Sequence, residues 1–135
     1  MKGVLVPMSE GCCCTQPSFN YIVACSGACS NLGQLSSRML LKLAREGRGK
    51  PFCLAGLGAH LPGFLERASR GSFLAIDGCP QQCAAKTLEH AGFKPARAVV
   101  ISNLGVEKSS ELEPPSEEVE KVFQKVKEEL ERRNA

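Results

Sequence analysis

Four short runs of residues most constrain the fold of this chain, because each is apolar at nearly every position. They occupy residues 20–24, 51–55, 72–76 and 98–101. Strands without a polar alternation are buried on both faces, as in a parallel sheet covered by helices. We therefore expect a single doubly wound α/β domain, with a mostly parallel sheet of about four strands and helices on both faces.

Helical signals fill the segments between these runs. The first predicted helix follows an N-cap at Ser30 or Asn31, and a short second helix lies within residues 60–69. A third is expected to begin at Pro80 and to stop at Gly92, because proline suits the first turn of a helix and glycine its end. Strand and helix thus alternate along the chain, which is the pattern of a βαβ fold.

The last predicted helix spans about residues 116–133 and begins at the capping residue Ser116. Apolar side chains recur at steps of three and four residues, as on the buried face of a helix. They are Val119, Val122, Phe123, Val126 and Leu130. Residues 19–135 are expected to form the single α/β metal-binding domain, preceded by an irregular, cysteine-rich arm at residues 1–18.

Composition and charge argue against several classes of function. The chain has 135 residues, a net charge of only +3, one tyrosine and no tryptophan, so nothing indicates nucleic-acid binding. No run approaches the roughly 20 apolar residues of a membrane span, and residues 3–7 are too short for a signal-peptide core. We expect a cytoplasmic protein that binds neither nucleic acid nor membranes.

The eight cysteines carry the question of function. They are Cys12, Cys13, Cys14, Cys25, Cys29, Cys53, Cys79 and Cys83. In a reducing compartment, clustered cysteines are more often metal ligands or reactive thiols than disulfides. The run of three in the N-terminal arm could either supply a metal ligand or form a reducible tail. The metal ion is the one partner that the sequence indicates.

Three of the cysteines are expected at one edge of the sheet. Cys25 ends the first strand, Cys79 ends the third, and Cys53 lies within or just before the end of the second. In the common order 2-1-3-4 the first strand lies between the other two, and neighbouring strands are about 4.8 Å apart. Cys83 follows Cys79 by four residues, one turn along the predicted helix. The carboxyl edge of the sheet is therefore the predicted metal site.

Neighbouring residues suit such a site. Gly27 and Gly78 lie beside cysteines and let the backbone approach an ion closely. Asp77 could orient a ligand or cap the following helix, and capping is the better interpretation. Ser26 could support an anion or form local capping hydrogen bonds. Cys29 lies just before the first predicted helix, where the helix dipole stabilises a thiolate.

The cysteine motifs resemble the DGC domain family, which is regarded as zinc-binding. They are Asp77-Gly78-Cys79-Pro80 with Cys83-Ala84, Cys25-Ser26-Gly27, Gly33-Gln34-Leu35 and Phe52-Cys53-Leu54-Ala55-Gly56. The resemblance covers about residues 20–93 and implies four chelating cysteines: Cys25, Cys53, Cys79 and Cys83. The turn after Cys25 is one residue longer than in that family. Cys29 is the extra residue, and it could replace Cys53 as a ligand.

Three functions remain open at this stage. Four thiolates around one zinc ion would form a closed site for metal handling or sensing. Alternatively, Cys79 or Cys25 could be the nucleophile of a sulfur-transfer or redox enzyme, or four cysteines could hold an iron–sulfur cluster. No catalytic residue is assigned, and neither His60 nor His90 is expected at the site.

Overall fold

The structure, a computed structural model, describes residues 19–132, which contain one four-stranded sheet with all strands parallel. The strands are β1 (Tyr21–Ala24), β2 (Lys50–Pro51), β3 (Phe73–Asp77) and β4 (Arg97–Val100), in the order β2-β1-β3-β4. The predicted doubly wound α/β fold is confirmed, as is the place of the first strand between the second and the third.

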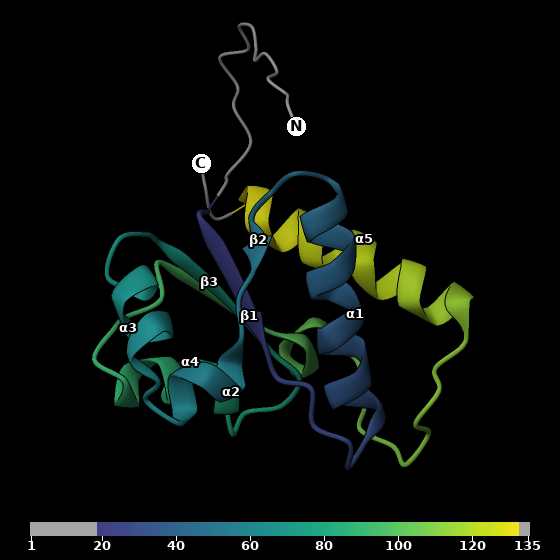
Figure 1. Ribbon diagram of the computed structural model, residues 1–135. Helices are drawn as coiled ribbons and strands as arrows, with labels where there is room; N and C mark the ends of the chain where they lie inside the picture. Colours follow the sequence, from purple (N-terminus) through teal and green to yellow (C-terminus); the bar gives the residue numbers. More distant parts are fainter. Residues whose placement is uncertain (1–18, 133–135) are drawn as a thin grey trace, which may run out of the picture.

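Helices surround this sheet on both faces (Figure 1). They are α1 (Asn31–Arg45), α2 (Leu54–Gly58), α3 (Pro62–Ala68), α4 (Cys83–His90), the 3-10 helix η1 (Ile101–Leu104) and α5 (Ser116–Arg132). Ser30 is the N-cap of α1, since its side chain accepts the backbone N–H of Leu32. Among the described residues, no helix is both long enough and apolar enough to cross a membrane. The predicted arm at residues 1–18 lies outside the described residues.

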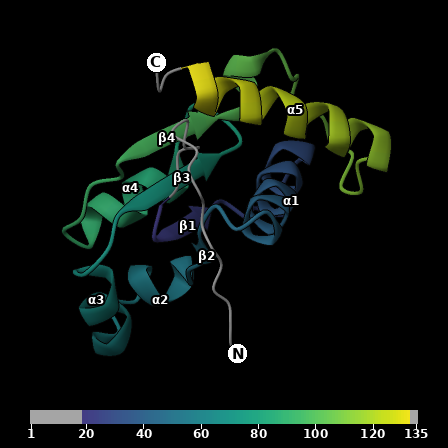
Figure 2. The same ribbon diagram turned by 90° about the horizontal axis from the view of Figure 1, so that it is seen from above.

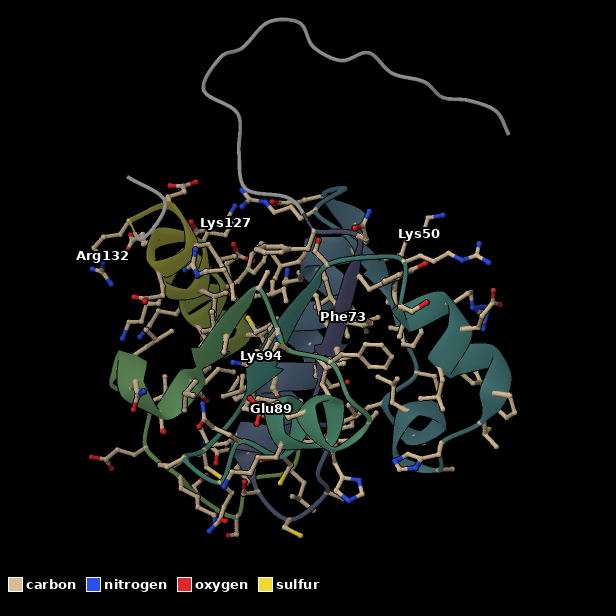
Figure 3. The ribbon with its side chains drawn as sticks, turned by 90° about the vertical axis from the view of Figure 1, so that its left-hand side faces the viewer. Lys50, Phe73, Glu89, Lys94, Lys127 and Arg132 are labelled. Carbon is tan, nitrogen blue, oxygen red and sulfur yellow. The ribbon has the colours of Figure 1, made fainter. Side chains whose placement is uncertain are left out.

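The helices form two layers, with α1 and α5 on one face of the sheet and α2, α3 and α4 on the other (Figure 2). Successive strand residues point to opposite faces. Ile22 and Leu74 therefore belong to the core beneath α1 and α5, whereas Val23 and Phe73 belong to the core beneath α2, α3 and α4. Phe73 is labelled in Figure 3. The five predicted apolar residues of α5 are all buried, which confirms that stripe.

The predicted strand at residues 51–55 is wrong beyond its first residue. β2 ends at Pro51, and Leu54–Gly58 is the helix α2. The Sγ atom of Cys53 accepts the backbone N–H of Gly56 at 3.2 Å, so Cys53 caps this helix. A short apolar run fits a helix as well as a strand, and none of residues 51–55 is buried, whereas Leu57 of α2 is fully buried.

The predicted helix start at Pro80 is also wrong, because α4 begins at Cys83. Pro80 lies instead in a tight turn, in which the backbone N–H of Gln82 donates to the carbonyl of Cys79 at 3.0 Å. Gln82 has a φ of 55°, in the left-handed region, and so cannot continue a right-handed helix. Cys79 and Cys83 are consequently not one turn apart on a single helix.

Candidate metal centre

Four of the cysteines line one cavity of about 150 Å³ at the carboxyl edge of the sheet, at the bottom of Figure 1. They are Cys25, Cys29, Cys79 and Cys83. The register of β1 and β3, with Ala24 opposite Ile76, carries two of these cysteines to the same edge. The cavity is completed by Gly27, Ser30, Leu32, Gly33, Asp77, Gly78, Gln82 and Lys108.

The turn that carries Cys25 is held by close backbone packing. A Cβ atom on Gly33 would lie only 2.0 Å from the carbonyl oxygen of Gly27. The Ser36 hydroxyl donates hydrogen bonds to the carbonyl oxygens of Cys25 and Gly33. The first turn of α1 is thereby packed directly onto the residues after β1.

Glycine is required on the β3 side as well. A Cβ atom on Gly78 would lie 2.6 Å from the carbonyl oxygen of Leu32, in the first turn of α1. No larger residue fits this approach without moving the backbone. The two cysteine-bearing segments, after β1 and after β3, are thus held against the same helix end.

Asp77 anchors the second segment. Its carboxylate, 1% exposed, accepts the backbone N–H of Ala84 at 2.7 Å and that of Ala85 at 3.1 Å. The interpretation that Asp77 caps the helix after Cys79 is therefore confirmed. Burial raises the pKa of this carboxyl, and the two N–H donors and Lys86 offset part of that shift. With both ends tied, residues 78–83 form a compact turn whose two thiols line the cavity.

Sequence reasoning missed the loop that closes this edge. The Asn31 side chain donates to the carbonyl oxygen of Glu107 at 2.9 Å and accepts the backbone N–H of Ser109 at 2.7 Å. These contacts hold Lys108, between the two loop residues, at the cavity wall. The loop has no periodicity, and its partner lies 76 to 78 residues away in sequence. No local signal could have identified it.

The thiol of Cys25 is half-buried at the end of β1. Burial raises its pKa, the N–H of Gly27 lowers it, and negative charge on Cys83, Asp77 and Cys79 raises it further. The Gly27 N–H lies 3.4 Å from the sulfur. Because its pKa is raised, this thiol stays protonated around neutral pH when no metal ion is bound. It is thus poorly suited to act as a nucleophile on its own.

Cys53, the remaining candidate ligand, faces a different cavity. This second cavity has a volume of about 570 Å³ and is also lined by Ser26. The structure therefore brings Cys29 together with Cys25, Cys79 and Cys83. Cys53 and Ser26 line the other cavity instead. Among residues 19–132, no three His, Cys, Asp or Glu side chains are arranged so that they could hold a metal ion together. The four thiols share a wall without converging on one point.

Comparison with known proteins supports one family. The DGC domain model matches residues 21–126, a stretch that includes all five cysteines described above. The chain is also 34% identical over 103 residues to the anaerobic and virulence modulator AnvM of Pseudomonas aeruginosa, covering 76% of this chain and 78% of that protein. No solved structure matches the chain. On this evidence the chain belongs to the DGC domain family.

Proposed function

We propose that this protein binds one zinc ion through the thiolates of Cys25, Cys29, Cys79 and Cys83, for metal handling or sensing. The observation that carries the proposal is that these thiols, from segments far apart in sequence, line a single cavity of about 150 Å³. Thiolates select soft or borderline ions such as zinc over magnesium or calcium. The Pseudomonas relative is named a modulator, and a sensing role agrees with that name.

The thiol chemistry is consistent with metal binding. The raised pKa of Cys25 means that its proton must leave when an ion arrives, so metal uptake should release protons. Among residues 19–132 no three His, Cys, Asp or Glu side chains already converge on one point, so binding requires the four sulfurs to turn toward one another about their single side-chain torsions. Four thiolates around Zn²⁺ would leave a net negative charge, which Lys108 in the cavity wall can compensate.

The fourth ligand is the point on which two arguments differ. The family motifs favour Cys53, whereas the shared cavity favours Cys29. Cys53 already accepts a hydrogen bond from the backbone of α2. Because Cys53 lines a different cavity from Cys25, Cys79 and Cys83, whereas Cys29 lines the same one, we favour Cys29.

Elemental analysis of the full chain, purified anaerobically with reductant and supplied zinc, tests the proposal. We expect about one zinc per chain, and less than a tenth of an equivalent would overturn it. Cys79→Ser and Cys83→Ser should each abolish tight binding. The triple change of Cys12, Cys13 and Cys14 to serine is the matched control, and zinc should be retained.

Absorbance spectroscopy separates the alternatives. A zinc protein is colourless, whereas an iron–sulfur cluster on the same cysteines absorbs visible light. If the protein contains no metal and one thiol reacts rapidly with iodoacetamide at neutral pH, the sulfur-transfer or redox alternative is favoured instead.

A further inference from the structure

The two histidines of this chain meet in the fold. His60, in the connection between α2 and α3, and His90, the last residue of α4, are 30 residues apart. The His90 Nδ1 atom lies 3.4 Å from the His60 Nε2 atom, and the rings stack with centroids 5.3 Å apart. The described cysteines do not take part in this contact. The pair is therefore a separate cluster of metal-ligating groups.

Local backbone structure fixes where the two histidines leave the chain. His60 has a φ of 58°, a left-handed conformation that is uncommon for a residue with a side chain. Its N–H donates to the carbonyl of Leu57 at 3.0 Å, which closes the turn after α2. The end of α2 lies close to α4, because a Cβ atom on Gly58 would be 3.4 Å from the Cγ2 atom of Thr87. The two imidazoles thus project from elements that are already packed together.

We propose that His60 and His90 bind a borderline divalent transition-metal ion such as Zn²⁺, Ni²⁺ or Cu²⁺, with water completing the coordination. Metal–imidazole bonds are about 2.0–2.1 Å long, so two nitrogens on a tetrahedral ion lie about 3.3–3.4 Å apart. The observed separation of 3.4 Å is within this range. In the structure the two nitrogens lie within hydrogen-bonding distance of each other, so a bound ion would replace the proton between them, and both histidines are exposed to solvent.

One member of the pair, His90, shares a surface cavity with Cys83. A surface cavity of about 390 Å³ is lined by Cys83, Thr87 and His90, which are spaced along one face of α4. Cys83 lines the thiol cavity as well. An ion that leaves the imidazoles can therefore reach a thiol along the wall of one cavity.

We assign the pair the role of a loading site for the thiols, a part of the inference that rests on the proposed function. Thiolates are softer ligands than imidazoles and four exceed two in number, so transfer toward the cysteines is favourable. The Lys86 ammonium lines the same surface cavity and opposes a bound cation. The imidazole site is therefore weak and exchanges quickly, as a loading site requires.

Nuclear magnetic resonance of the histidine rings tests the site directly. The probe is NiCl₂ added to the full chain after its thiols have been saturated with Zn²⁺ or, where zinc is not taken up, kept reduced. We expect the signals of both rings to shift or broaden together at the same nickel concentration. A response of only one ring, or of neither, overturns the proposal.

Variants give the matched comparison. His90→Gln should weaken the nickel response of His60 at least tenfold, and His60→Asn should do the same for His90, because asparagine tolerates the left-handed backbone. Gln81→Ala, in the same surface cavity, should leave the response unchanged. Far-ultraviolet circular dichroism verifies that each variant is folded. An unchanged nickel response of the remaining ring in both histidine variants overturns the site.

The loading role has its own measurement. Reduced, metal-free protein is mixed with zinc bound to a colorimetric indicator, and the transfer is followed in time. His90→Gln should slow the transfer at least threefold without changing the final amount of zinc, and equal rates overturn the loading role. If the wild-type protein takes up no zinc at all, the proposed function fails, while the nickel experiment still decides whether the histidine site exists.

Discussion

The carboxylate of Asp77 accepts a 2.7 Å hydrogen bond from the backbone N–H of Ala84, seven residues further along the chain. This contact joins the last residue of β3 to the first turn of α4. Cys79 and Cys83 lie on the segment that it encloses. The position of two candidate ligands therefore depends on one buried carboxylate.

Replacing Asp77 with alanine should destabilise the protein by about 2 kcal/mol, because two buried N–H groups at the start of α4 lose their acceptor. Asp77→Asn keeps one acceptor oxygen and should cost less. Urea unfolding followed by circular dichroism measures both changes. Equal stability of the alanine variant and the wild type would contradict the role of Asp77 as a cap.

The same residue predicts a pH dependence. Because burial raises the folded-state pKa of Asp77 above the ordinary value of about 4, the folded protein binds this proton more tightly than the unfolded chain does. The resulting stability is present at low pH and is lost as pH rises through the raised value. The stability of the wild type relative to Asp77→Asn should therefore decrease from pH 4 upward, as measured by urea unfolding across this range.

Gly33→Ala should be strongly destabilising, by about 3 kcal/mol, because the new methyl group would lie 2.0 Å from the carbonyl oxygen of Gly27. Zinc content should fall with it, since the turn after Cys25 must move. Gly63→Ala in α3 is the matched control, because no atom lies within 4 Å of the added Cβ. Thermal unfolding of the two variants compares them, and similar melting temperatures would contradict the close packing.

Asn31→Ala should loosen the loop that carries Lys108, since both side-chain hydrogen bonds to residues 107 and 109 are lost. The backbone N–H of residue 31 still donates to the Ser109 carbonyl at 3.0 Å. We expect a loss of about 2 kcal/mol and faster hydrogen exchange at the Ser109 amide. Asn31→Asp keeps the acceptor for Ser109 but not the donor to Glu107, so its exchange rate should be intermediate. Unchanged exchange in both variants would show that the loop is held by other contacts.

Cys29→Ser and Cys53→Ser distinguish the two candidate sets of ligands. With Cys29 as the fourth ligand, its replacement should lower zinc affinity by at least tenfold, whereas Cys53→Ser should retain the metal. Competition with a chelator of known affinity measures both values. Loss of zinc in Cys53→Ser alone would return the assignment to the set implied by the family motifs.

Removal of zinc should lower the melting temperature without unfolding the domain, because both cores are complete without a metal. Free zinc at about a hundred times its dissociation constant contributes roughly 2.7 kcal/mol. For a domain of this size that corresponds to a shift on the order of 10 °C. Circular dichroism before and after chelation tests this. Complete loss of secondary structure would mean that the two apolar cores cannot keep the domain folded without the metal.

The fold and part of the candidate site follow from local patterns. The buried stripe of α5 repeats every three or four residues, and the cysteines after β1 and β3 lie where parallel strands end. These features can be predicted from the sequence because the spacing of apolar residues indicates which helix face is buried, and because parallel strands end at a common edge of the sheet. The family motifs pointed to Cys25, Cys79 and Cys83, and also to Cys53, which lines a different cavity.

Only the tertiary structure decided several element boundaries and the contacts between distant segments, because no local pattern indicates them. Residues 51–55 are apolar whether they form a strand or, as observed from Leu54 on, a helix capped by Cys53. Because Gln82 has a left-handed backbone conformation, α4 begins only at Cys83. Two contacts join segments that are distant in sequence. Asn31 hydrogen-bonds to residues 107 and 109, and His60 contacts His90. The sequence by itself determined the alternation of strands and helices, the buried stripe of α5 and the cysteines that follow β1 and β3, because these depend on local spacing. Which side chains meet depends on how the helices pack, and only the tertiary structure decided that.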